Sequence, residues 1–94
     1  MDIAENLTQI GTWTRDSFHK DEMRIALFLR LTRKDINNII DFPFPPEFSP
    51  KFKKFCRHYA KLESEFKKGI TDHHSWSATM LTWATVLTES AILV

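Results

Sequence analysis

The chain has 94 residues, 43% of them hydrophobic and 13% aromatic, and its 13 Lys and Arg face 12 Asp and Glu. A chain of this length is too short for a Rossmann domain, a TIM barrel or a two-domain enzyme. Its ordinary apolar content and net charge of +1 argue against intrinsic disorder. We therefore expect a single domain that spans residues 1–94.

Glycine and cysteine are both scarce in this sequence. Strand-rich folds usually need more turn glycines than the two present here, so we expect an all-α fold. The single cysteine, Cys56, allows no internal disulfide, and we interpret it as a small buried hydrophobic residue. Residues 1–6 are acidic and have neither the basic nor the apolar region of a secretory signal. These features predict a cytoplasmic protein.

Two helical segments are predicted before the prolines. Residues 3–14 have apolar side chains at three- and four-residue steps, although Gly11 weakens this helix by about 1 kcal/mol relative to Ala. Residues 21–40 have apolar side chains on two sides, which is typical of a central helix, while the alternation over residues 25–31 leaves a strand as the alternative. Because Thr32 can cap a new helical turn, the second segment is predicted as either one helix or two.

Residues 41–50 form a connector rich in proline and phenylalanine. Its four prolines remove four amide donors and favour extended backbone, so we expect neither a helix nor a paired strand. Its aromatic residues, Phe42, Phe44 and Phe48, would each contribute about 1.5–3 kcal/mol on burial. We expect them to close one end of the core. The alternative is a preformed extended surface whose aromatic side chains a partner recognises.

Residues 50–68 show the strongest local helix signals. Ser49 suits the N-cap, Pro50 suits the first helical position, and Gly69 suits the left-handed residue just past the end. Apolar side chains at steps of three and four form one stripe, which consists of Phe52, Phe55, Tyr59, Leu62 and Phe66. This stripe predicts a helix with one face on the core.

The opposite face of this helix is basic. Residues 51–68 contain seven Lys or Arg and two Glu, a net charge of +5, so the rest of the chain has a net charge of −4. The face is either solvated surface or the contact site for an anionic partner, whether nucleic acid, nucleotide or an acidic protein. The candidate binding residues on it are Lys51, Lys53, Lys54, Arg57 and Lys61, and Arg30, Arg33 and Lys34 would extend it if the two helices are neighbours.

The last segment, residues 71–94, begins with capping groups and continues as an amphipathic helix. We interpret its apolar stripe as a core face or as a seam between copies of the chain, since apolar termini are usually docked. The residues expected at an oligomer or partner interface are Trp76, Met80, Trp83, Leu87, Ile92 and Val94. Glu89 is the only charge after Trp76, but the Ser and Thr hydroxyls and the missing basic flank argue against a membrane span.

Sequence motifs for catalysis or metal binding are absent. His73 and His74 are adjacent, so on a helix they would point about 100° apart and would not readily chelate one ion. No phosphate-binding Gly loop, paired Cys motif or Ser-centred elbow occurs. We therefore expect no metal, no cofactor and no enzymatic activity.

Together these patterns predict a compact all-α bundle of four to five helices with the connector 41–50 at one end. The function we expect is that of a small non-catalytic interaction protein, a regulator, adaptor or inhibitor of the kind encoded by phages and mobile elements. It would dock on another protein and form a homo-oligomer. The alternative is nucleic-acid or nucleotide binding, with residues 32–40 and 50–68 as a helix-turn-helix variant. The connector is longer than a helix-turn-helix turn, and Arg57 would be the only obvious base reader.

Overall fold

A computed structural model describes residues 3–90, and this part of the chain is all-helical. The described helices are α1 (Ile3–Ile39), α2 (Ser49–Lys68) and α3 (His73–Ser90). The all-α prediction is confirmed. The alternative of a strand over residues 25–31 is wrong, because these residues lie within α1.

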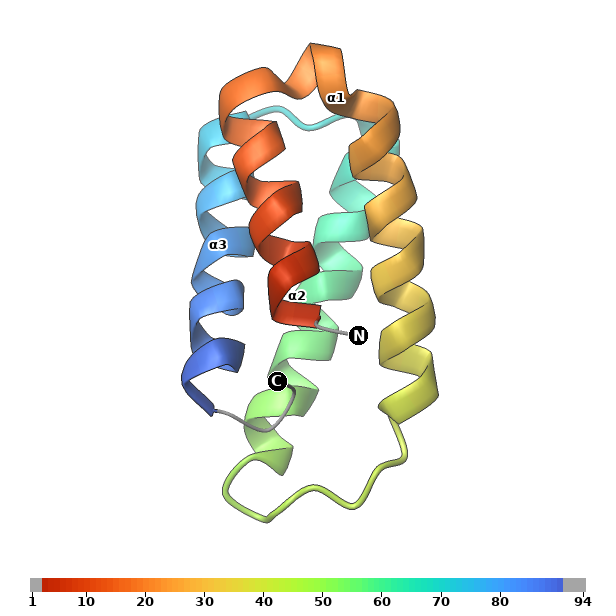
Figure 1. The fold of residues 1–94 in the computed structure, drawn as a ribbon, viewed down its shortest axis with the longest axis vertical. Helices are drawn as coiled ribbons and strands as arrows, with labels where there is room; N and C mark the ends of the chain where they lie inside the picture. Colours follow the sequence, from red (N-terminus) through yellow and green to blue (C-terminus); the bar gives the residue numbers. More distant parts are fainter. Residues whose placement is uncertain (1–2, 91–94) are drawn as a thin grey trace.

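Helix α1 bends sharply at Ser17, whose φ of −155° and ψ of 41° are not helical. The bend divides α1 into a first arm, residues 3–16, and a second arm, residues 18–39, which run in opposite directions (Figure 1). Together with α2 and α3, the two arms form an up-down-up-down bundle. The described part has three helices rather than the predicted four or five. Residues 15–20 contain neither Gly nor Pro, so the two segments predicted before the connector join into α1.

The second arm of α1 is one uninterrupted helix. Thr32 is fully buried, and its hydroxyl donates to the Phe28 carbonyl at 2.7 Å instead of capping a new helix. Of the two alternatives for residues 21–40, the single helix is confirmed and a second helix starting at Thr32 is wrong. Asp35, three residues later, has a buried Oδ2 for which the described residues provide no hydrogen-bond partner. Burial raises the pKa of Asp35 above the usual value for an aspartate.

The connector closes one end of the bundle with two of its three aromatic rings. Phe44 and Phe48 pack against Phe52 of α2, with ring centroids 4.9 and 6.0 Å away, whereas Phe42 remains 59% exposed. The expectation that all three would close the core is wrong for Phe42.

The predicted ends of α2 agree closely with the structure. Phe48 occupies the N-cap position without a side-chain cap, so the cap predicted at Ser49 is one residue too late. Pro50 lies in the first turn, where its missing amide costs no helical hydrogen bond. Gly69 ends the helix with a φ of 100°, a left-handed value that favours glycine.

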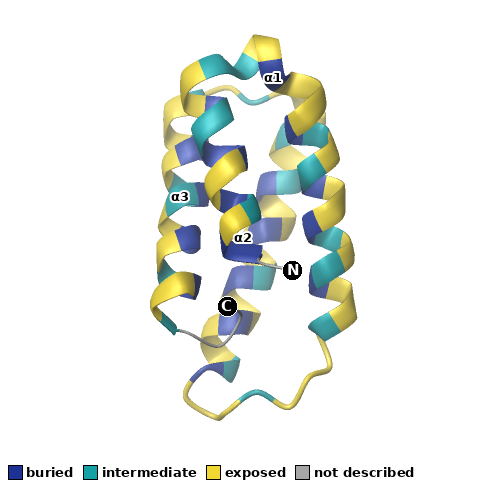
Figure 2. Cartoon of the chain, in the orientation of Figure 1, coloured by how far each residue is buried: buried dark blue, intermediate teal, exposed yellow. Residues whose placement is uncertain are grey.

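The buried residues lie on the inward sides of the helices (Figure 2), and their side chains form a hydrophobic core. Its largest members are aromatic residues with polar tips, and each tip has a partner. The Tyr59 hydroxyl donates to the Leu29 carbonyl at 2.9 Å, and Trp76 Nε1 donates to the Leu62 carbonyl at 3.1 Å. These bonds satisfy polar groups that would be costly to bury alone.

The first arm of α1 and helix α3 pack closely at Gly11. A Cβ on this residue would lie 2.6 Å from Leu81 Cγ and 3.3 Å from the Ser77 carbonyl oxygen. Gly11 was expected to be a weak point of an isolated helix. Its missing side chain instead makes room for α3.

Gly11→Ala is expected to lower the free energy of unfolding by about 1 kcal/mol, since overpacking outweighs the gain in helix propensity. Urea unfolding followed by circular dichroism measures the effect. In a Leu81→Ala background the same change should be neutral or stabilising, because the obstructing side chain is gone. Ser64→Ala, at an exposed position of α2, is the control for helix propensity alone. Stabilisation of the wild-type chain by Gly11→Ala would contradict this account.

Asp35→Asn is expected to stabilise the fold near neutral pH. The raised pKa means that the folded chain holds the Asp35 carboxylate less favourably than the unfolded chain does. Stability from the protonated form is present in acid and is lost as the pH rises through the unfolded and then the folded pKa. The gain on substitution should therefore be measurable by urea unfolding at about pH 7 and vanish at about pH 3. Glu47→Gln, at an exposed connector site, is the control, and an equal gain at both pH values would refute the prediction.

Candidate functional site

Helix α2 exposes its predicted basic face to solvent. The buried stripe of Phe52, Phe55, Tyr59 and Leu62 turns the opposite side of the helix outward. All five candidate cations of this helix are exposed, and none makes an ion pair within residues 3–90; they are Lys51, Lys53, Lys54, Arg57 and Lys61. Residues 50–62 contain no acidic side chain, so this row of charge is uncompensated along more than three helical turns.

The second arm of α1 lies beside α2, as the extension of the basic face requires. The Tyr59 hydroxyl bonds the Leu29 carbonyl, and Arg33 reaches Glu63 from α1 to α2. Residues 23–34 contain four cations and no acid. Arg30 and Lys34 are exposed and make no ion pair in the described part of the chain. The structure thus places two stretches without acidic residues on neighbouring helices, which the pair of Arg33 and Glu63 links.

Arg33 differs from the other seven candidate cations, because it is already paired. Its Nε lies 3.1 and 3.3 Å from the two carboxylate oxygens of Glu63, and one of its terminal nitrogens also donates to that group. The guanidinium Cζ is 5.3 Å from the ring centroid of Tyr59. Hydrogen bonding to Glu63 raises the pKa of Arg33. In the folded chain Arg33 therefore ties α1 to α2, and its contact with an anionic partner stays a prediction.

An exposed apolar stripe on the second arm is the feature that the sequence analysis missed. Met23, Leu27 and Leu31 follow each other at four-residue steps and are 88%, 43% and 37% exposed. The core face of the same arm is formed by other residues, among them Ile25 and Leu29. The sequence does show two apolar faces on this arm, and the sequence analysis assigned both faces to the core of a central helix. In the four-helix arrangement the neighbouring helices cover only the face that contains Ile25 and Leu29.

The interface residues predicted on α3 lie in the core of the single chain. Trp76, Met80, Trp83 and Leu87 are all buried against α1 and α2, with Trp83 the most exposed at 8%. Trp83 packs on Phe55 with 5.5 Å between ring centroids. The prediction of an oligomer seam at these four residues is wrong, because the fold itself covers them. Ile92 and Val94 lie outside the described residues.

Helix α2 and helix α3 border an open groove of about 620 Å³ near the loop that joins them. Lys61 and Lys68 line it together with Glu65 and Asp72, so both charges are represented. Asp72 accepts a hydrogen bond from the Ser75 amide and thereby caps α3. The groove contains both positive and negative side chains, and Asp72 already caps the nearby N-terminus of α3. It therefore offers no cluster of free positive charge that would bind an anion.

The described part of the chain contains no group of side chains that could hold a metal ion. No cluster of three or more His, Cys, Asp or Glu side chains occurs within residues 3–90. Cys56 is half-buried, and burial raises the pKa of its thiol, which disfavours the reactive thiolate.

The helix-turn-helix arrangement considered for the connector does not form. The second arm of α1 and helix α2 run antiparallel beside each other (Figure 1), whereas the helices of that motif cross at a steep angle. Nucleic acid would therefore meet the outer row of α2 rather than a recognition helix set against a second helix.

Comparisons with protein-family models, with curated proteins and with solved structures find no match to this chain. Among the helices of residues 3–90, none is sufficiently long and apolar to cross a membrane.

Proposed function

We propose that this chain is a small non-catalytic interaction protein that docks on an acidic protein partner through the second arm of α1. The docking face consists of the apolar stripe and the unpaired cations beside it: Met23, Leu27, Arg30, Leu31 and Lys34. The observation that supports it is the exposure of the stripe on a bundle whose core is complete without it. The free thiol of Cys56 supports action in the cytoplasm.

The apolar part of the docking face would supply most of the binding free energy. Burial of a Leu or Met side chain contributes about 1.5–3 kcal/mol, and three such residues suffice to anchor a small, transient interface. Arg30 and Lys34 would add specificity and faster association rather than a large share of affinity. The complementary surface is an acidic one with apolar residues at its centre.

The same apolar residues favour a protein over a nucleic acid as the partner of this face. A phosphate backbone is charged and offers no apolar surface to cover methionine or leucine side chains, whereas a protein surface does. Residues 49–68 of α2 also contain no Asn or Gln for base recognition.

Leu27→Glu combined with Leu31→Glu is expected to abolish docking while leaving the fold intact. As a probe we would titrate an amphipathic helical peptide made of Glu and Leu, which offers the proposed acidic and apolar chemistry. The double variant should bind it at least about tenfold more weakly, from lost apolar burial and added repulsion. Circular dichroism verifies folding.

The matched control is Thr82→Glu combined with Thr85→Glu, which adds the same charge at exposed positions of α3. This control should bind the acidic peptide like the wild type. In capture from the native host, proteins lost with the α1 variant but retained with the control should be acidic. Equal peptide affinity for all three proteins would overturn the proposal.

A second candidate function, binding of nucleic acid or a nucleotide, is favoured by the unpaired cations of α2. The row runs along an outer helix face, as contact with a phosphate backbone requires. Contacts of this kind recognise charge and spacing rather than sequence.

If α2 binds nucleic acid, the affinity for duplex DNA should fall by about tenfold to a hundredfold between about 50 and 200 mM salt. Exchange of Lys53, Arg57 and Lys61 for Glu should abolish this binding, and fluorescence anisotropy measures it. The Thr82→Glu, Thr85→Glu protein is the control, because its added charges lie on α3 and it should retain DNA binding. Lack of binding at low salt, or an unchanged affinity after the exchange, excludes this candidate.

A further inference from the structure

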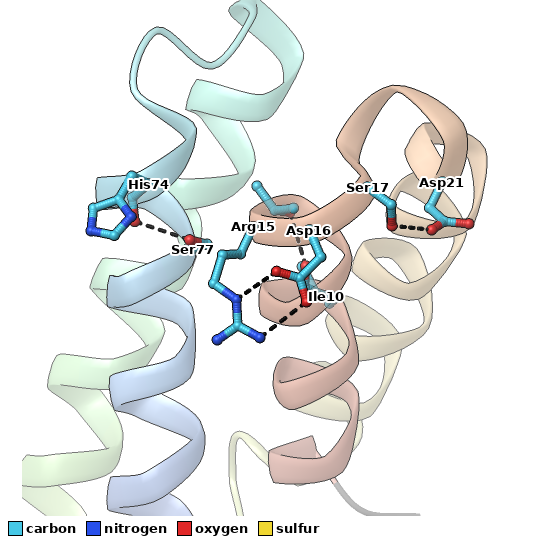
Figure 3. Close-up of polar contacts among 8 residues, drawn as sticks. Ile10, Arg15, Asp16, Ser17, Asp21, His74 and Ser77 are labelled. Atoms are coloured by element: carbon cyan, nitrogen blue, oxygen red, sulfur yellow. Dashed lines mark hydrogen bonds and ion pairs between the residues drawn. The ribbon is translucent and has the colours of Figure 1, made fainter.

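The bend in α1 depends on a single residue. Ser17 is the one position of the 37-residue helix with non-helical dihedral angles, and residues 12–20 contain neither Gly nor Pro. The Ser17 hydroxyl donates to the carboxylate of buried Asp21, and Figure 3 shows the two side chains facing each other at the bend. A change of conformation at this one residue would convert both arms into one straight helix.

The first arm is held mainly by contacts that any copy of the chain could provide. Its buried face packs closely on α3 at Gly11, and Trp13 meets Phe28 of the second arm edge-on at 4.9 Å. An arm that leaves its own bundle would expose the matching surface of α3. A second copy can cover that surface with its own first arm through the same contacts, because the arm is an intact packing unit.

In the straight form of α1, the first arm cannot pack on α3 of its own chain. A straight helix of 37 residues would measure about 56 Å, against a longest extent of 39 Å for the folded chain. The first arm would then project about 20 Å beyond its own bundle. It could not return to its own α3, so its burial would require a partner.

We propose that α1 straightens at Ser17 and that two copies of the chain exchange their first arms to form a domain-swapped dimer. The occupant of the vacated α3 surface is thus the first arm of a second copy. This interface differs from the expected seam of α3 side chains, and it uses none of the residues of the docking face. It therefore stands independently of the proposed function.

The hinge residue sets the balance between monomer and exchanged dimer. Ser17→Ala removes the bond to Asp21 and favours helix at this position in both chains, so the dimerisation constant should rise at least about fivefold. His19→Pro should have the opposite effect. Proline is tolerated in the first turn after the bend but not inside a straight helix, so the constant should fall more than about a hundredfold. His19→Ala controls for the lost ring, and light scattering after size-exclusion chromatography measures the masses.

Crosslinking distinguishes arm exchange from simple face-to-face association. Thr8 of the first arm and Thr85 of α3 line one groove, so cysteines at both sites lie within reach of a short bis-maleimide in the folded chain. With Cys56→Ala as the background, the dimer fraction should yield covalent dimers on a denaturing gel and the monomer fraction should not. A dimer that yields only crosslinked monomers would overturn the proposal. So would a Ser17→Ala protein that remains monomeric at every concentration, or a His19→Pro protein that dimerises like the wild type.

Discussion

The buried hydroxyl of Tyr59 determines how α2 faces the rest of the bundle. Tyr59 lies in the middle of the apolar stripe of α2, and its bond to the Leu29 carbonyl fixes α2 against the second arm of α1. With the ring pointing inward, the row from Lys53 to Lys61 has to point outward, and Glu63 comes within reach of Arg33. The basic surface is therefore a consequence of the burial of the apolar stripe, within which Tyr59 also satisfies its polar atom.

The helix with the best local signals, α2, was predicted almost to the residue. Pro50 and Gly69 act through their own backbone preferences, which do not depend on what surrounds them. The bend at Ser17 has no such signal, since residues 12–20 contain neither Gly nor Pro. The hydrogen bond from Ser17 to Asp21 and the packing of the two arms accompany the bend, and neither follows from a backbone preference of one residue. Gly11 shows the same limit from the other side. The low helix propensity of Gly11 can be read from the sequence. Its contribution to the fold cannot, because it makes room for Leu81, which lies 70 residues away in the chain.

The candidate site was only partly accessible from the sequence for a related reason. Periodicity shows that a side chain belongs to an apolar face, but it does not show what covers that face. Trp76 and Trp83 were left between core and interface, and packing placed them in the core. Leu27 and Leu31 were assigned to the core, and packing left them outside. Arg33 looked equivalent to Arg30 until the fold brought Glu63 beside it.

Trp83 also constrains the one histidine of α2. Its indole Nε1 donates to His58 Nδ1 at 3.2 Å and so ties α3 to α2. Helix α2 is also tied to the second arm of α1, through the Tyr59 hydroxyl and the contact between Arg33 and Glu63. Side-chain bonds to two neighbouring helices resist rotation of α2 about its own axis. The outward row of lysine and arginine is therefore held in one orientation before any partner arrives, so binding carries no cost for orienting the helix that presents it.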